Sequence, residues 1–177
     1  YNAGCCFDYG NAETDNRDLG KGTMEAVYFG SWNASHFGWS GGVGMGPWVM
    51  ADLENGLWAG SQTPVNPQNT PIVADFVTAM VKGDRANHWA VKGGDASDAA
   101  GLRTLYEGAR PCTQPNITDC EHAPNYNPMR KQGAIILGIG GDNSHGAIGS
   151  FYEGAITAGF SSNETDAAVH ADIVAAG

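Results

Sequence analysis

Basic residues are scarce in this sequence. Of its 177 residues, Lys and Arg supply 9 and Asp and Glu supply 19, which gives a formal net charge of -10 at pH 7. No more than two basic residues stand together, so the positive field that attracts phosphate groups is missing. We therefore exclude nucleic acid as a partner.

Long apolar runs are also missing. The longest one, at residues 134–139, is far shorter than the roughly 20 residues that a helix needs to cross a bilayer, and we therefore expect no membrane partner. No signal-like segment precedes Tyr1. We expect the sequence to begin inside a processed or truncated chain.

The sequence lacks the ligand spacing of a metal site. Its histidines are scattered singly along the chain: His36, His88, His122, His145 and His170. The glycine-rich string GIGGDNSHG at residues 138–146 lacks the Lys and the Ser or Thr of a phosphate loop, and it lacks the full dinucleotide-binding spacing. We therefore predict no metal and no cofactor.

Glycine, by contrast, is abundant. The 26 glycines are about twice the average usage, and together with the aromatic residues they predict short strands joined by tight turns. A helix remains an alternative to a strand at residues 75–82, because periodicity cannot settle so short a run. The regular spacing predicts an all-β sandwich. We expect strands at residues 24–29, 47–54, 76–81, 88–92, 102–106, 134–139 and 149–158.

One short helix is expected at the C-terminal end of the sequence. Ser161, with Glu164 three residues later, matches a capping box. Val169, Ile173 and Ala176 then recur at helical spacing. This pattern predicts that the sandwich ends in a helix.

The clearest strand is PWVMADLE, at residues 47–54. Alternation places Trp48, Met50, Asp52 and Glu54 on one face. A type I′ turn at residues 55–56 would begin a return strand at residues 57–59. Two acids on one face belong either to the solvated side of a sheet or to a carbohydrate site, where aromatic rings stack on sugar and carboxylates bind hydroxyls.

A further candidate acid is Asp142, which the string GIGGDNSHG presents on a turn after an apolar strand. Aspartate after glycines is also ordinary turn chemistry, so this residue alone identifies no site. Ser144 beside His145 lacks the geometry of a nucleophile pair.

The four cysteines allow three pairings, and Cys112 and Cys120 flank a polar loop that a local disulfide could close. The Cα atoms of Cys5 and Cys6 would lie about 3.8 Å apart across a trans peptide, below the usual disulfide range, so geometry favours pairing each with Cys112 or Cys120. Disulfides favour an extracellular compartment. Three sequons permit N-glycosylation there: Asn33, Asn116 and Asn163.

Several long strings resemble the fungal α-L-arabinofuranosidase B family, glycoside hydrolase family 54, nearly end to end. They are CCFDYGNAETDN, MEAVYFG, GPWVMADLENGLWAG, FVTAMVKG, GARP and YNPMRKQGAIILGIGGDNSHGAIGSFYEGAITAGF. The resemblance implies a concanavalin A-like β-sandwich of jelly-roll type. It implies that residues 1–177 are the C-terminal half of one catalytic domain, whose N-terminal half and arabinose-binding β-trefoil are absent. We expect that missing half as a partner, on a separate segment or chain.

The resemblance also assigns roles to residues. The nucleophile falls on Glu54 and the general acid/base on Asp142. The sugar would lie against a disulfide between Cys5 and Cys6, which overturns the geometric preference, and Cys112 would then pair with Cys120. Gly56 stands where the family has a second asparagine. The remaining sugar contacts fall on Trp39, Asp52, Asn55 and Gly141.

The function that the resemblance implies is that of a secreted, retaining α-L-arabinofuranosidase. It would hydrolyse terminal α-L-arabinofuranosyl residues of arabinoxylan or arabinan, with the two carboxyl groups about 5 to 5.5 Å apart. One alternative is a lectin-like module that binds sugar without turnover. Another is a purely structural secreted β-domain.

Overall fold

The computed structural model describes residues 4–12, 24–32, 38–53, 56–60, 64–84, 88–109 and 133–177, with residues 38–40 by their backbone alone. Two sheets and one helix fall within these ranges. The larger sheet has the order β10-β1-β2-β4-β5-β3-β6, with strands Ile135–Leu137, Asp8–Asn11, Glu25–Gly30, Trp48–Leu53, Gly56–Trp58, Gly38–Gly42 and Val65–Asn66. The smaller sheet has the order β7-β8-β9, with strands Val77–Gly83, His88–Asp95 and Arg103–Ala109. Helix α2 spans Asn163–Ala176.

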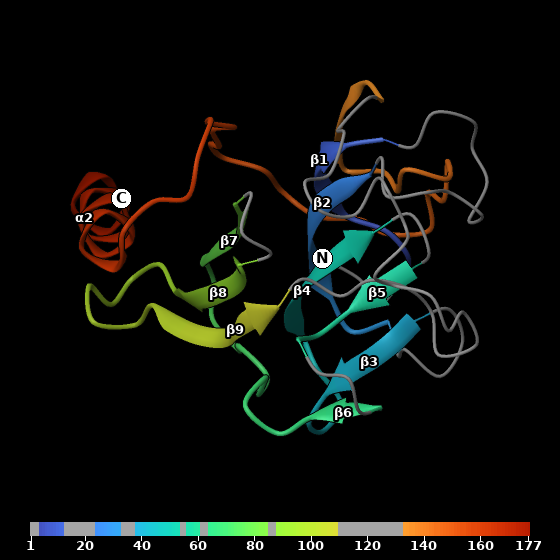
Figure 1. Cartoon of the computed structure of the whole chain (residues 1–177), viewed down its shortest axis with the longest axis horizontal. Helices are drawn as coiled ribbons and strands as arrows, with labels where there is room; N and C mark the ends of the chain where they lie inside the picture. Colours follow the sequence, from blue (N-terminus) through green and yellow to red (C-terminus); the bar gives the residue numbers. More distant parts are fainter. Residues whose placement is uncertain are drawn as a thin grey trace.

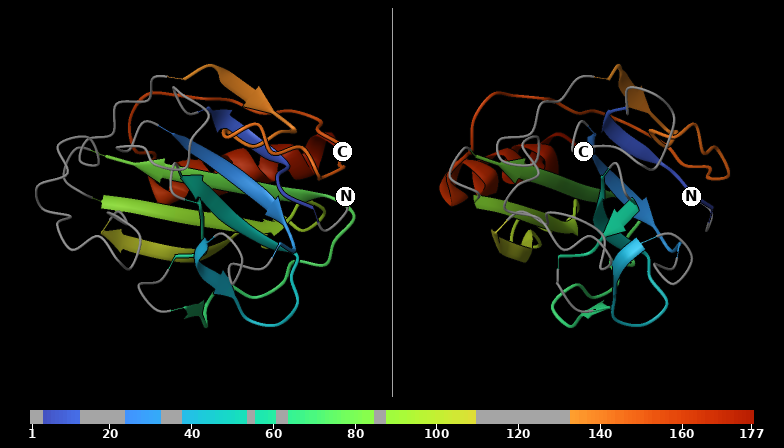
Figure 2. Two further views of the ribbon diagram at one scale, coloured as in Figure 1. Left: turned by 90° about the vertical axis from the view of Figure 1, so that its right-hand side faces the viewer. Right: turned by 45° about the vertical axis from the view of Figure 1, so that its right-hand side comes forward.

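The two sheets pack as layers, and α2 lies on the outer side of the smaller sheet (Figure 1). Strand β2 contacts β7 and β4 contacts β8, which places the middle of the larger sheet over the smaller one (Figure 2). The described strand pairs are antiparallel, except that β3 runs parallel to β5 and β6. The predicted all-β sandwich with a C-terminal helix is confirmed. Among the described residues, no helix is long and apolar enough to cross a bilayer.

The core between the sheets is built around aromatic rings. Trp58 from β5 lies 4.9 Å from Trp89 of β8 and 4.7 Å from Tyr106 of β9, measured between ring centroids. Tilted and edge-on contacts of this kind add to the stabilisation from burial. The remaining buried members of this cluster are aliphatic: Val49, Ala51, Leu53, Ile72, Val91 and Leu105.

Strand β4 is buried on both faces. Its odd-numbered residues contribute to the core between the sheets, whereas Trp48 and Met50 join a second cluster on the opposite face with Cys6 and Tyr28. Asp52 shares this second face and is only 7% exposed. The predicted alternation is therefore confirmed, and the interpretation of this face as a solvated sheet surface is wrong.

Most other predicted strands are confirmed, at β2, β7, β8, β9 and, in shortened form, β10. Residues 75–82 contain a strand, so the helical alternative is wrong. Leu53 pairs with Gly56, so the return strand begins one residue earlier than predicted and only residues 54–55 connect β4 to β5. The strand predicted at residues 149–158 is absent, and nearly all of these residues are exposed. Strands β1, β3 and β6 were not predicted.

Helix α2 begins one residue later than the predicted capping box implies. Its N-cap is Ser162, whose Oγ accepts a hydrogen bond of 3.2 Å from the Thr165 amide. The hydroxyl of Ser161 instead donates to Asp166. Val169, part of the predicted apolar spacing, is 46% exposed. The helix therefore docks through residues other than those that the apolar pattern marks.

Polar contacts dock α2 on the smaller sheet. The Oδ2 atom of Asp166 accepts from Lys82 Nζ at 2.5 Å and from Lys92 Nζ at 2.6 Å, and all three side chains are at most 7% exposed. One turn later, the buried His170 lies 3.0 Å from the Thr78 hydroxyl. The helix is thus held by buried charges and hydrogen bonds.

Two asparagines fasten the segment around β6 to the core. The Nδ2 atom of Asn66 donates to the carbonyls of Ala59 and Leu105 at 2.8 and 2.9 Å. The Nδ2 atom of Asn69 donates to the carbonyls of Val49 and Ala59 at 2.8 and 3.1 Å. Side-chain amides therefore tie this segment to both sheets.

Candidate active site

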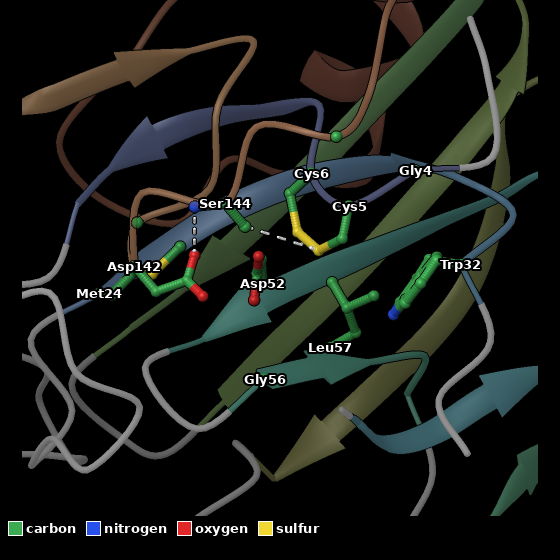
Figure 3. Close-up of a pocket in the computed structure, with 12 residues that line it drawn as sticks. Gly4, Cys5, Cys6, Met24, Trp32, Asp52, Gly56, Leu57, Asp142 and Ser144 are labelled. Atoms are coloured by element: carbon green, nitrogen blue, oxygen red, sulfur yellow. Dashed lines mark hydrogen bonds between the residues drawn. A yellow bond between two sulfur atoms is a disulfide. The ribbon is translucent and has the colours of Figure 1, made fainter. Parts of the chain in front are cut away.

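A cavity of about 460 Å³ opens on the face of β4 and β5 that points away from the smaller sheet (Figure 3). Four parts of the chain enclose it: the segment before β1, the residues that flank β2, the strands β4 and β5, and the loop after β10. Its lining is Gly4, Cys5, Cys6, Met24, Trp32, Asp52, Gly56, Leu57, Gly141, Asp142, Ser144 and Gly146. Carboxylates thus face apolar side chains and sulfur across one pocket, a combination suited to a sugar.

The floor of the cavity carries Asp52 beside a disulfide. Alternation along β4 turns the Asp52 side chain toward the cavity, opposite Leu57 of β5. Cys5 and Cys6 are bonded to each other, so the geometric preference for pairing them with other cysteines is wrong. That preference assumed a trans peptide, whereas this peptide bond is cis and the Cα atoms are 3.0 Å apart.

The loop after β10 forms the wall that carries Asp142. Backbone hydrogen bonds dock the loop on the first segment, from Gly138 N to Asp8 O at 2.8 Å and from Gly146 N to Cys5 O at 2.7 Å. Ser144 N donates to Asp142 Oδ1 at 2.8 Å, which fixes the carboxylate at the cavity. Figure 3 shows Asp142 and Asp52 reaching the pocket from different walls. Asp142 therefore lies on a turn, as ordinary turn chemistry predicts, and it also lines the candidate site.

A third acid, Asp8, lies buried beneath these two. It begins β1, opposite Tyr28 of β2, and is 1% exposed. Burial raises the pKa of the Asp8 carboxyl well above its usual value, and the charge of Asp52, a hydrogen bond with Asp52 and the charge of Asp142 raise it further. Sequence reasoning missed Asp8. Its spacing of two residues from Cys6 was the available signal, because strand alternation puts both on one face.

Five of the predicted site residues line the cavity together: Cys5, Cys6, Asp52, Gly141 and Asp142. Glu54 and Asn55 lie outside the described residues, as does the side chain of Trp39, but Gly56 directly after them lines the cavity. Also outside are Asn33, Asn116, Cys112 and Cys120. Asn163, the remaining sequon, is exposed at the start of α2, and its Oδ1 accepts from Lys92 Nζ at 2.6 Å.

The sequence reasoning missed six further lining residues: Gly4, Met24, Trp32, Leu57, Ser144 and Gly146. For Leu57 the register of the β4–β5 hairpin was the available signal, because it places this residue opposite Asp52. No comparable signal marked Met24 or Trp32.

Ligand atoms of Cys5, Cys6 and Asp52 lie within 4.8 Å of one another, a spacing that could hold a metal ion. The two sulfurs are bonded to each other, however, and a metal requires thiolates. The trio therefore does not fit a metal centre.

The arrangement defines a β-sandwich whose acidic cavity is bounded by a disulfide between neighbouring cysteines. Comparison with known proteins makes the assignment specific. A family model described as "Alpha-L-arabinofuranosidase B, catalytic" matches residues 1–177. The chain belongs to this family, and the resemblance drawn from the sequence is confirmed.

Individual relatives agree with the family model. The chain is 54% identical over 177 residues to a probable α-L-arabinofuranosidase B of Aspergillus clavatus and 53% identical over 176 residues to an α-L-arabinofuranosidase of Hypocrea jecorina. These matches cover 99% of this chain but 32% of each relative. The chain thus spans about a third of the length of these curated relatives.

Solved structures show the same fold. An arabinofuranosidase complexed with arabinofuranosyl-α-1,2-xylobiose matches with a TM-score of 0.81 and 47% identity, over 99% of this chain and 33% of the other. A glutamate-to-glutamine variant of a GH54 α-L-arabinofuranosidase, soaked with 4-nitrophenyl α-L-arabinofuranoside, matches with the same TM-score of 0.81.

Proposed function

We propose that this chain carries the sugar-cleaving site of a secreted, retaining α-L-arabinofuranosidase. The enzyme would release terminal α-L-arabinofuranosyl residues from arabinoxylan or arabinan by double displacement. The observation that carries the proposal is the cavity that Asp142 and Asp52 line together, with Asp52 two residues before Glu54 in the sequence. The solved relative that binds arabinofuranosyl-α-1,2-xylobiose supports an arabinose side chain as substrate.

In this mechanism Glu54 attacks the anomeric carbon while Asp142 protonates the departing glycosidic oxygen. An arabinosyl-enzyme forms, and the leaving sugar diffuses away. Asp142 then takes a proton from water, which attacks the same carbon and releases arabinose with its configuration retained. The amide of Ser144 supports this role, because its hydrogen bond to Oδ1 orients the carboxyl and leaves Oδ2 for the substrate.

Binding falls to the groups around these two acids. Asp52 would accept hydrogen bonds from sugar hydroxyls, and its 7% exposure keeps that contact largely shielded from water. The disulfide and Trp32 supply an apolar wall for the C–H faces of the ring. In this proposal the wall orients the sugar ring, and Glu54 and Asp142 carry out the bond cleavage.

We further propose that the rest of a family catalytic domain covers one side of this chain. The relatives are about three times as long as this chain, and large apolar side chains of β10 and of the chain that follows it stand exposed. Their exposed fractions range from 39% to 74%: Ile135, Leu137, Ile148, Phe151, Tyr152 and Ile156. Large exposed apolar side chains are a feature of surfaces that another segment or chain covers.

The test is release of 4-nitrophenol from 4-nitrophenyl α-L-arabinofuranoside by the protein at its natural length. Glu54→Gln should abolish turnover, and Asp142→Asn should lower it, with azide restoring release because azide needs no general base. Asp98→Asn is the matched control, since Asp98 Oδ1 makes the same turn bond, to Ala100 N at 2.9 Å, away from the cavity. Arabinose binding without turnover would contradict the proposal and favour a lectin-like module.

A further inference from the structure

Asp8 is a buried acid for which the proposed mechanism has no use. It is 1% exposed and is not among the residues that line the cavity. Neither of its carboxyl oxygens receives a hydrogen bond from an N–H or O–H group within the described part of the chain. An ionised carboxylate in this position would be buried without compensation, which is costly.

The surroundings of Asp8 are acidic on more than one side. Asp52 reaches it from β4, and Asp142 faces it from the loop after β10. On the neighbouring strand β2 the residue opposite Asp8 is Tyr28, whose phenol oxygen accepts a hydrogen bond from the Trp32 amide at 2.9 Å. Burial, first, and then these charges all raise the pKa of Asp8. Two carboxyl groups in contact cannot both ionise away from water, so one of the pair must keep its proton.

The choice between Asp8 and Asp52 follows from their positions relative to the cavity. Both side chains are buried, but Asp52 lines the cavity whereas Asp8 does not, so the negative charge of a pair that shares one proton is better placed on Asp52 than on Asp8. A proton on Asp8 gives its otherwise unsatisfied carboxyl group a hydrogen bond to make, because an O–H group of one carboxyl can bond to the carboxylate of the other.

We propose that Asp8 is a positioning residue that is held as a neutral carboxylic acid and donates a hydrogen bond to Asp52, keeping Asp52 ionised and directed at the sugar hydroxyls. This inference deepens the proposed function, and only its effect on turnover rests on that function. The protonation of Asp8 is a property of the folded chain with or without sugar.

The kinetic test compares Asp8→Asn with Asp8→Val, two side chains of similar size. Asparagine keeps a neutral donor, whereas valine keeps none. A hydrogen bond to a charged group is lost in the valine variant, and kcat/KM should fall about 10- to 100-fold. The asparagine variant should recover to within about 5-fold of the natural protein. If Asp8→Asn is folded and as impaired as Asp8→Val, Asp8 acts as an anion and the proposal is overturned.

The spectroscopic test needs no turnover. The infrared spectrum near neutral pH should contain the C=O stretch of a protonated carboxylic acid, which Asp8→Asn removes. The control is Asp172→Asn, which changes an exposed acid on α2 and should therefore leave both the fold and the band in place. No loss of the band in Asp8→Asn would refute the neutral acid, even if Asp8→Val failed to fold.

The two tests separate this inference from the proposed function. If the natural protein hydrolyses no arabinofuranoside but the Asp8→Asn variant lacks the acid band, the proposed function is contradicted and a neutral Asp8 is supported. If the natural protein is active but Asp8→Asn leaves the infrared spectrum unchanged, the proposed function is supported and a neutral Asp8 is contradicted.

Discussion

Replacing Asp166 by alanine should destabilise the protein strongly. Asp166 is 3% exposed and is the shared partner of Lys82 and Lys92, whose side chains are 7% and 5% exposed. Its removal leaves two lysine charges buried without a counter-charge, and breaking a buried ion pair costs about 3 to 5 kcal/mol. For a chain of this size such a loss lowers the melting temperature by about 6 to 20 °C.

Urea unfolding followed by circular dichroism measures this loss. Asp172→Ala is the control, because this acid is exposed on the same helix and should change the unfolding free energy by less than about 0.5 kcal/mol. A cost below about 1 kcal/mol for Asp166→Ala would refute the reasoning, since it would mean that water reaches the lysines.

The same site sets a pH dependence with a definite sign. Burial alone would raise the pKa of Asp166, but hydrogen bonds from Lys82, Lys92 and Ser161 outweigh it and lower the pKa. A lowered pKa in the folded state stabilises the protein above the unfolded value of about 3.9. That contribution is lost as the pH falls through the folded value, so the difference between Asp166→Ala and the natural protein should shrink in acid.

Two further substitutions test the packing around the site. Asn69→Ala removes buried hydrogen bonds to the carbonyls of Val49 and Ala59 and should cost about 2 kcal/mol in urea unfolding; a cost no larger than that of the exposed Gln68→Ala would contradict the structure. Ser162→Ala removes the N-cap of α2 and should cost about 1 kcal/mol, whereas Ser162→Asp should preserve the cap.

The sequence predicts the strands whose side chains alternate within a packed layer. In β4, Trp48, Met50 and Asp52 alternate with apolar residues, and each of the two sets lies on a different buried face of the strand. The prediction from the regular spacing of strands between turns was wrong at residues 149–158, where Phe151 and Tyr152 are exposed. A sequence pattern indicates which side chains are suited to burial, but a strand also requires hydrogen bonds to the backbone of a neighbouring strand. The sequence of the segment itself does not show whether such a neighbour exists.

The site was predictable only in part, for a related reason. Asp142 and Asp52 each stand in a distinctive string, whereas Asp8 acquires its importance from strands that bring it beneath Asp52. Contacts between residues so far apart in the sequence cannot be predicted from local patterns. The docking of α2 was missed for the same reason. Asp166 and His170 are polar residues that become buried because Lys82 and Thr78 on the smaller sheet bind them.

The docking of the residue 138–146 loop on the segment before β1 has a consequence for how the protein is made. Strand β1 pairs with β10, and the Gly146 amide bonds to the Cys5 carbonyl, so the walls of the cavity come from opposite ends of the described chain. Contacts between such distant segments close a long loop and form slowly. Since synthesis proceeds from the N-terminus, the disulfide segment is made before the loop of residues 138–146, and it remains without its opposite wall until that loop has been synthesised. The cavity therefore cannot form before residue 146 has joined the growing chain.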